Sequence, residues 1–338
     1  MKRFVVLLSV CALLAAACSG SEESDTITLL THESFVLSEG TFEAFTAETG
    51  ITVDVVSSGD AGAVVAAAIA TAGDPVGDVL FGVDNLLLQR ALDGDVFRSH
   101  EASGLDDVPD RFKLDAENRV TPIDTGYVCV NYRPEDLEGD GPSSLDDLRQ
   151  PQYAAEFITQ NPESSTPGLA FLFATIATFG EDGWQDYWRD LRDNGVTVTS
   201  GWSEAWAEYV GGDPGGDKGI VNSYASSPVF EGLFGGENPT VSSILVDSCF
   251  AQIEFAGVLE GTDSPNNAGQ LIDYLLSPAV QGDIPLNMFV EPVNDRAVVP
   301  DEFAAFAVPV PSPLSLPPAE IAANQARWTQ EWLDLLRE

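Results

Sequence analysis

The sequence predicts an α/β protein of two lobes, with a hinge and a ligand cleft between them, and three observations lead to this prediction. Short β-rich apolar runs alternate with helical patterns, which is typical of a parallel sheet covered by helices. This alternation occurs in two separate groups along the chain. The 338 residues also exceed what a single hydrophobic core usually supports.

The first group begins with a strand at residues 26–31 and a helical pattern that stops at Gly50. A second strand at 51–56, an alanine-rich helix over 60–72 and a third strand at 78–83 follow. The order strand, helix, strand, helix, strand indicates parallel pairing.

The second group repeats the alternation. The expected strands are 126–132, 196–199, 220–224 and 249–255, and the expected helices are 167–179 and 203–210. Two sheet-and-helix lobes fit this spacing better than one closed barrel.

The C-terminal part lacks this alternation of strands and helices. Residues 308–318 hold five prolines and should be extended, whereas 318–337 form an amphipathic helix whose tryptophans we interpret as core residues. We therefore divide the mature chain into one lobe of residues 26–124 plus 256–338 and another of residues 125–255.

The N-terminus has the layout of a secretory signal, with two basic residues followed by an apolar run that ends at Ala17. Leu14 to Cys18 resembles the bacterial lipobox, although Ala15 stands where leucine is usual. We expect a signal peptide at 1–17, lipidation of Cys18, and a membrane-anchored tether over 18–25; ordinary signal cleavage is the alternative. The folded part should lie outside the cytoplasm, as a lipoprotein on the outer face of the cell membrane or as a periplasmic protein if it is unlipidated.

The charge excludes one class of partner. The chain has 54 acidic and 15 basic residues and a net charge of −39, so nucleic acid should be repelled. A cationic ligand is permitted, although such acidity also serves solubility or a salty environment.

Two cysteines remain once the N-terminal segment is set aside. Cys129 and Cys249 lie in what should be an oxidising compartment, where they can form a disulfide or remain as two buried thiols. They lack the spacing and partners of a zinc site, so we expect no metal.

Polar and aromatic residues follow the predicted strands, at the edge where open α/β sheets bind ligands. They are His32, Asp60, Asp84, Asp124, Ser165, Trp202 and Tyr224. Ser165 precedes a helix that opens with proline, so it can help bind an anion or can simply cap the helix.

Carboxylates beside aromatic rings suit a flat cationic ligand, because the rings can stack on it and the carboxylates can offset its charge. Trp202, Tyr224 and Phe230 are the aromatic candidates. We interpret Trp206 as a core residue.

Four motifs make the chain similar to one family. Residues 165–169, 196–205, 223–228 and 82–85 resemble, in order and spacing, the thiamine-binding proteins of bacterial thiamine ABC importers. The likeness extends from about Thr28 to Trp332.

This resemblance implies a two-lobed periplasmic-binding fold, no catalysis, no cofactor, and thiamine or a thiamine phosphate held between the lobes for an importer permease. The resemblance places Asp60, Ser165, Trp202, Tyr224 and Phe230 at the ligand. We expect a monomer. His32 would lie on the first-strand loop.

The chain departs from the family pattern at three places. His32 and Phe230 stand where tyrosine is familiar, and residues 288–289 stand where an asparagine and a tryptophan are expected. The choice between thiamine and its phosphates, and the role of His32, therefore stay open.

The connections between the lobes are expected near residues 124–132 and 251–257. If those strands are neighbours, Cys129 and Cys249 could be bridged across the hinge.

One segment resembles the active-site motif of an enzyme. Residues 201–205 approach the nucleophile elbow of hydrolases around Ser203, but Ala205 replaces the last glycine and no histidine follows. We therefore expect a binding protein and not an enzyme. A polyamine or ferric iron is the alternative ligand, since fold alone does not separate these importers.

Overall fold

The computed structural model describes residues 23–210, 218–236 and 239–337. The expected signal peptide at 1–17, Cys18 and most of the 18–25 tether lie outside the described residues. Within the described ranges, no helix has the length and apolar character needed to cross a membrane.

The described strands form one sheet of ten strands, in the order β2-β1-β3-β9-β5-β8-β6-β7, with β10 paired to β5 and β4 paired to β9. Their bounds are β1 Thr26–Thr31, β2 Thr52–Ser57, β3 Val79–Asp84, β4 Phe97–Arg98, β5 Thr121–Tyr132, β6 Phe157–Gln160, β7 Thr197–Thr199, β8 Ile220–Tyr224, β9 Ser243–Leu259 and β10 Glu291–Pro292.

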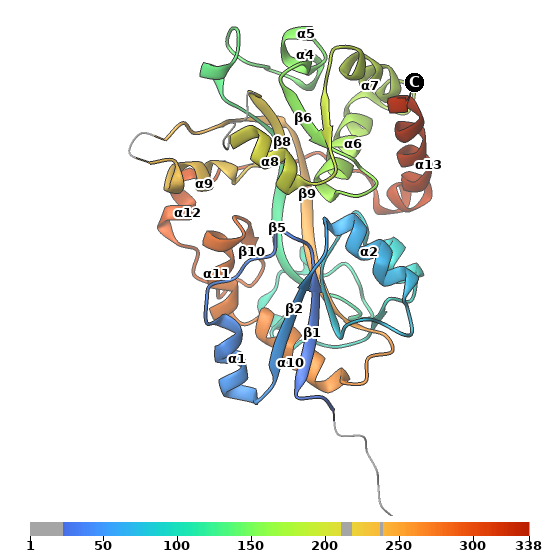
Figure 1. Cartoon of the computed structure of the whole chain (residues 1–338), viewed down its shortest axis with the longest axis vertical. Coiled ribbons are helices and arrows are strands. Elements are labelled where there is room, and N and C mark those ends of the chain that lie inside the picture. The colour runs from blue at the N-terminus through green and yellow to red at the C-terminus, as the bar shows by residue number, and fades with distance from the viewer. Residues whose placement is uncertain (1–22, 211–217, 237–238, 338) are drawn as a thin grey trace, which may run out of the picture.

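Helices cover this sheet (Figure 1). Their bounds are α1 Thr41–Thr49, α2 Ala61–Ala70, α3 Leu88–Asp93, α4 Leu145–Leu148, α5 Pro151–Ala154, α6 Thr166–Phe179, α7 Trp184–Asp193, α8 Trp202–Val210, α9 Ser227–Phe234, α10 Pro265–Leu275, α11 Pro278–Asn287, α12 Asp301–Phe306 and α13 Pro318–Arg337.

The fold is α/β and two-lobed, as the sequence predicts. In the first lobe β1 pairs in parallel with β2 and β3, and in the second β6 pairs in parallel with β7 and β8. The long antiparallel strands β5 and β9 run through both lobes and join them (Figure 1). These two strands are the segments in which the sequence predicts the crossings.

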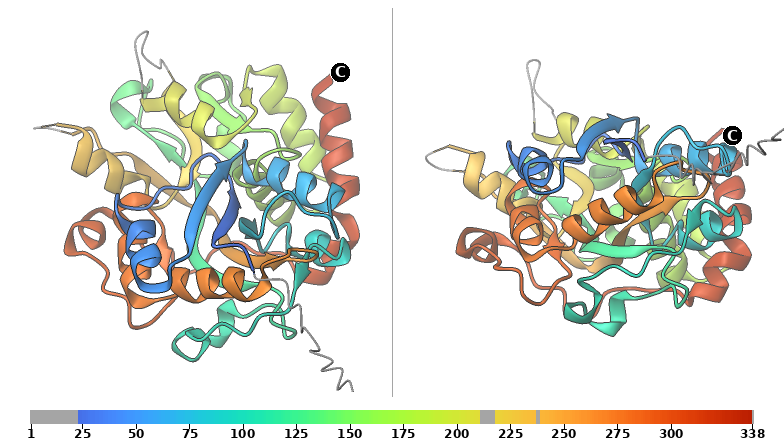
Figure 2. Two further views of the ribbon diagram at one scale, coloured as in Figure 1. Left: turned by 60° about the horizontal axis from the view of Figure 1, so that its bottom comes forward. Right: turned by 90° about the horizontal axis from the view of Figure 1, so that it is seen from below.

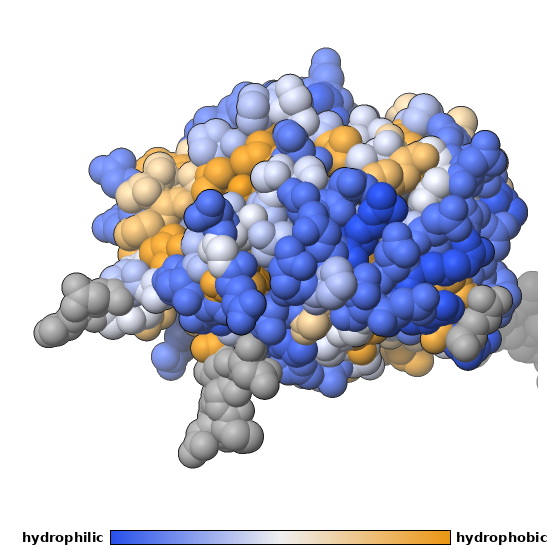
Figure 3. All heavy atoms as spheres, turned by 90° about the horizontal axis from the view of Figure 1, so that it is seen from above, coloured by the Kyte–Doolittle hydropathy of each residue, from blue (hydrophilic) through white to orange (hydrophobic). Residues whose placement is uncertain are grey.

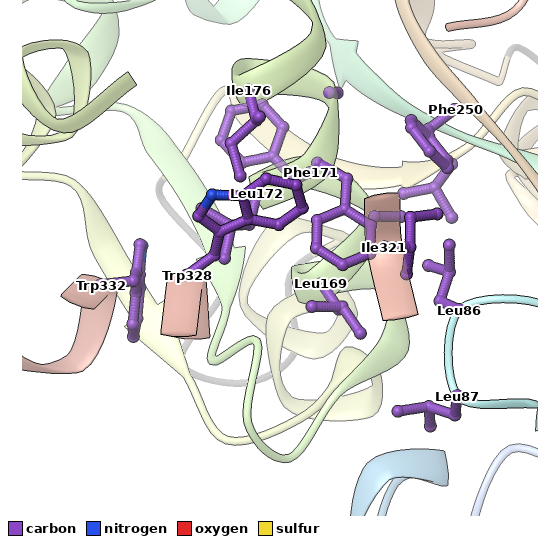
Figure 4. Packing of buried hydrophobic residues seen from close by; sticks show 14 of the residues in the cluster. Leu86, Leu87, Leu169, Phe171, Leu172, Ile176, Phe250, Ile321, Trp328 and Trp332 are labelled. Atoms are coloured by element: carbon purple, nitrogen blue, oxygen red, sulfur yellow. The ribbon is translucent and has the colours of Figure 1, made fainter. Parts of the chain in front are cut away.

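The C-terminal helix corrects the predicted lobe division. α13 packs against α7 of the second lobe, and Trp328 and Trp332 lie 5.7 Å and 5.3 Å, between ring centroids, from Phe173 and Trp188. Figure 4 shows Trp328 and Trp332 in the same buried cluster as Leu172 of α6. Figures 1 and 2 show α13 along one edge of the molecule, far from α1. Assigning this helix to the first lobe is therefore wrong, because the chain has already returned to the second lobe at α12, which packs against α9, and it stays there through the proline-rich segment to α13. The interpretation of its tryptophans as core residues is confirmed, since both are buried.

The two remaining cysteines form a disulfide, which decides between the two readings of this pair. Cys129 of β5 and Cys249 of β9 are both buried, with an S–S distance of 2.06 Å. The bond lies where β9 bulges, because Val128 pairs with Phe250 whereas Val130 pairs with Leu245. It therefore ties together the two strands that join the lobes.

The surface reflects the acidic composition. The end of the molecule seen in Figure 3 is covered mainly by hydrophilic residues, with apolar side chains in separate patches.

Candidate functional site

A cavity of about 310 Å³ lies between the lobes, and both lobes line it. Five of the predicted site residues are in its lining: His32, Asp60, Trp202, Tyr224 and Phe230. The other three, Asp84, Asp124 and Ser165, are almost fully buried directly behind the lining. The loops at the carboxyl ends of the strands therefore meet around one space.

Aromatic rings form one wall of the cavity. Trp202 and Trp206 stack with their ring centroids 5.5 Å apart and their planes inclined by 13°. Tyr224 and Phe230 complete the wall with edge-to-face contacts. The Tyr224 and Trp202 ring centroids are 6.2 Å apart, and those of Phe230 and Trp206 are 5.8 Å apart. The interpretation of Trp206 as a core residue holds only in part. Its ring packs against a buried cluster that includes Tyr209, but it also lines the cavity with Trp202, because residues four apart on a helix lie on the same face.

Phe289 adds a further ring that the sequence did not single out as a site residue. It lines the cavity beside Phe230, at 5.4 Å between centroids. Its backbone has a φ of 57°, a conformation that is rare for a bulky residue and is often found at ligand sites. The carbonyl of Phe289 accepts a hydrogen bond from the Ser226 hydroxyl, which helps to hold this backbone in place.

Asp60 connects the lobes. As the residue before α2, it accepts a hydrogen bond on Oδ1 from the Ala61 N–H at 2.6 Å and one on Oδ2 from the Trp202 N–H at 2.8 Å. A second contact between the lobes joins the hydroxyls of Ser34 and Ser203, 3.2 Å apart. Burial raises the pKa of Asp60, and the two N–H donors oppose this rise.

Three buried carboxyl groups lie behind and beside the ring wall. Glu254 of β9 is directly opposite Asp84 of β3 and opposite Asp124 of β5, so one strand register brings all three together. Glu254 lines the cavity, and its side chain contacts His32, with Oε1 and Nε2 separated by 3.4 Å. Asp84 accepts hydrogen bonds from two backbone N–H groups and from Gln252 Nε2, the last at 3.0 Å.

Sequence reasoning missed Glu254, although a signal was present. Gln252 and Glu254 alternate with apolar residues in a segment expected to be a strand, and positions two apart face the same side of a sheet. Polar side chains at such spacing in a buried strand point to a site.

The backbone beside His32 is shaped to admit its ring. Gly82 has a φ of 100°, and a Cβ at this position would lie 2.5 Å from His32 Cδ2. Glycine is therefore needed in this strand for the imidazole to reach the cavity.

Burial and mutual repulsion shift the titration of this group of residues. Burial, reinforced by the charge of Glu254, raises the pKa of Asp84 to about 7 and raises the pKa of Asp124 well above its ordinary range. Burial would lower the pKa of His32, but the carboxyl groups around it, Glu254 above all and then Asp60 and Asp84, together raise it. The cluster therefore holds protons more tightly than isolated side chains do.

We expect the unliganded protein to lose stability as the pH rises from about 4 to about 7. The folded state binds the Asp84 proton more tightly than an unfolded chain does, because the pKa rises from 3.8 to about 7. The raised pKa of His32 acts in the same direction. The midpoint of thermal unfolding should therefore be lower at pH 8 than at pH 5 by at least about 4 °C. Asp84→Asn should reduce the difference, and an equal or higher midpoint at pH 8 would contradict the prediction.

The start of α6 faces the cavity. Thr166 and Pro167 line it, and Ser165 occupies the N-cap position. The Ser165 side chain makes no capping hydrogen bond, so the simple capping interpretation is wrong for its hydroxyl. Free N–H groups at a helix start attract anionic or hydroxyl oxygens.

Several buried polar atoms around the cavity lack a hydrogen-bond partner of normal geometry. They are His32 Nε2, Asp124 Oδ2, Ser165 Oγ, Thr166 Oγ1 and Gln252 Oε1. Buried polar atoms are nearly always paired in folded proteins, so these five are available to donate to or accept from a ligand in the cavity.

Comparison with known proteins identifies relatives. A family model described as "Bacterial extracellular solute-binding protein" matches residues 74–312. The "Thiamine-binding periplasmic protein" of Escherichia coli is 31% identical over 256 residues, 75% of each chain, and that of Salmonella typhimurium is 28% identical over 337 residues, 98% of each. A solved "Periplasmic thiamin binding protein" superposes with a TM-score of 0.80 at 26% identity, over 92% of this chain and 96% of that one.

Proposed function

Because this chain belongs to the bacterial extracellular solute-binding protein family, we propose that it captures thiamine outside the cytoplasm and delivers it to an ABC importer permease. It is a binding component of transport and not an enzyme. Ser203, the candidate hydrolase nucleophile, has the hydroxyl of Ser34 as its neighbour at 3.2 Å instead of a base.

One observation carries the proposal. The cavity between the lobes sets a wall of stacked rings, Trp202 and Trp206, beside the carboxylate of Glu254. Thiamine is a flat aromatic cation, so its rings can stack on this wall while its positive charge approaches the carboxylate. A polyamine would use the carboxylates but would leave the stacking surface without a planar partner.

Ferric iron is less well matched to the same cavity. Among the residues that the structure describes, no three or more His, Cys, Asp or Glu side chains are grouped so that they could hold a metal ion. Hard cations bind clusters of oxygen ligands, whereas rings and a few polar atoms dominate this lining.

The start of α6 favours a ligand with an oxygen-bearing arm. The hydroxyls of Ser165 and Thr166 and the free N–H groups of the helix can receive the hydroxyethyl group of thiamine or the phosphate of an ester. Thiamine and its phosphate ester both fit this chemistry. Displacement of one by the other in a competition titration measures which binds more tightly.

Calorimetry with thiamine, thiamine monophosphate, spermidine and ferric citrate tests the proposal. We expect saturable binding of one thiamine per chain and no saturation by spermidine or iron. Saturable spermidine or iron binding without thiamine binding would overturn the assignment.

A membrane anchor through Cys18 belongs to the same proposal, since the lipobox-like segment directly precedes that cysteine. Protein purified from membranes should carry a lipid mass on Cys18. A soluble mature chain with an unmodified N-terminus would overturn the anchor and leave the binding function intact.

A further inference from the structure

The carboxyl groups at the inner end of the cavity exceed the positive charge available to them. Glu254 faces titratable groups from every element packed around it: His32 after β1, Asp60 before α2, Asp84 of β3, Asp124 of β5 and Tyr224 of β8. Among these groups only His32 can become a cation. Four carboxyl groups therefore share one imidazole in a buried space.

Two side chains that line the cavity and are more than nine-tenths buried show that this cluster is incomplete. The exposed fractions of His32 and Gln252 are 8% and 3%; Gln252 Oε1 lacks a hydrogen-bond partner, and His32 Nε2 has only the contact of 3.4 Å with Glu254 Oε1. Asp124 Oδ2, behind them and with an exposed fraction of 2%, makes no hydrogen bond of normal geometry, and its carboxyl group faces that of Glu254. These atoms come from three different strands or their ends and surround Glu254, so the missing partner belongs beside that carboxylate.

We propose that Glu254, backed by Asp84 and Asp124, is the counter-ion that selects a positively charged ligand, and that ligand binding expels a proton from this cluster into bulk solvent. This inference rests on the proposed function and names the group that recognises the charge of thiamine. Glu254 is the member that can touch a ligand, because it lines the cavity whereas Asp84 and Asp124 lie behind it.

Proton release is expected because the carboxyl groups lie so close together. Closely spaced buried carboxylates cannot all ionise unless a cation neutralises them, so the empty cluster retains protons. The raised pKa values of Asp84 and Asp124 agree with this. A ligand cation takes over the neutralising role, and the proton leaves. Affinity should therefore fall as the pH is lowered, by up to about tenfold per pH unit for each proton displaced.

The test is calorimetry of thiamine binding at pH 7 in two buffers of different ionisation enthalpy, which measures the protons released. Wild-type protein should release protons on binding thiamine, and Glu254→Gln should not. Glu254→Gln should also bind thiamine at least about tenfold more weakly. Glu260→Gln is the matched control, since Glu260 is exposed just beyond the end of the same strand. It should bind thiamine and release protons like the wild type.

Two further measurements separate a charge effect from misfolding. Glu254→Gln should keep the circular dichroism of the wild type, because glutamine has nearly the same shape as glutamate. Asp124→Asn should release fewer protons while it still binds thiamine. Wild-type affinity in Glu254→Gln, or thiamine binding without proton release, would overturn this inference alone. If wild-type protein does not bind thiamine, the proposed function fails and this inference fails with it.

Discussion

Replacement of Trp202 by alanine is expected to weaken thiamine binding by about 2–4 kcal/mol, or roughly 30- to 1,000-fold. Trp202 stacks on Trp206 and contacts Tyr224, so its loss removes the centre of the ring wall. Calorimetry on wild type and variant measures the difference directly.

The fold should survive this change. The indole N–H of Trp202 donates to the Ser223 hydroxyl, but that hydroxyl also has Ser227 as a partner, so no buried group is left unpaired. The hydrogen bond from the Trp202 backbone to Asp60 does not involve the indole. Trp202→Phe, which keeps a stacking ring, should recover much of the affinity. An unchanged affinity in the alanine variant, with native circular dichroism, would exclude Trp202 from the site.

Removal of the Cys129–Cys249 disulfide should lower the free energy of unfolding by about 4 kcal/mol. The bond closes a long loop, with a sequence separation of 120, and therefore restricts the unfolded chain strongly. Denaturation in urea of wild type and of the double variant Cys129→Ala and Cys249→Ala measures this loss.

Unfolding of both proteins in the presence of a reducing agent is the control for that experiment. The reducing agent should destabilise the wild type and leave the double variant unchanged. Thiamine affinity should stay within a few-fold at 25 °C, because neither sulfur lines the cavity. Equal unfolding midpoints for the two proteins would show that the bond does not stabilise the fold.

The sequence was sufficient for much of the site. His32, Asp60 and Trp202 follow three different strands, and the rule that ligands bind beyond the carboxyl ends of strands places them at one cavity. Tyr224 was found in the same way, whereas Phe230 was found as an aromatic candidate and through the family resemblance.

The residues that were missed or misjudged depend on contacts that cross the chain. Trp206 has the spacing of a core residue, and only the position of α8 beside the cavity brings its ring into the lining as well. Glu254 lies inside a strand instead of after one, so the rule of strand ends does not find it. α13 was assigned to the wrong lobe, because an amphipathic pattern shows that one face is buried but not which surface buries it.

Local periodicity and composition were thus sufficient to determine the α/β class, the two lobes, and the loops that supply the ligand site, because these properties arise between neighbours in the chain. The tertiary structure alone decided that Asp84, Asp124 and Glu254 share one buried place, since strand register joins residues up to 170 positions apart. Whether buried carboxyl groups keep their protons depends on that register and on burial, and neither is written in the local pattern.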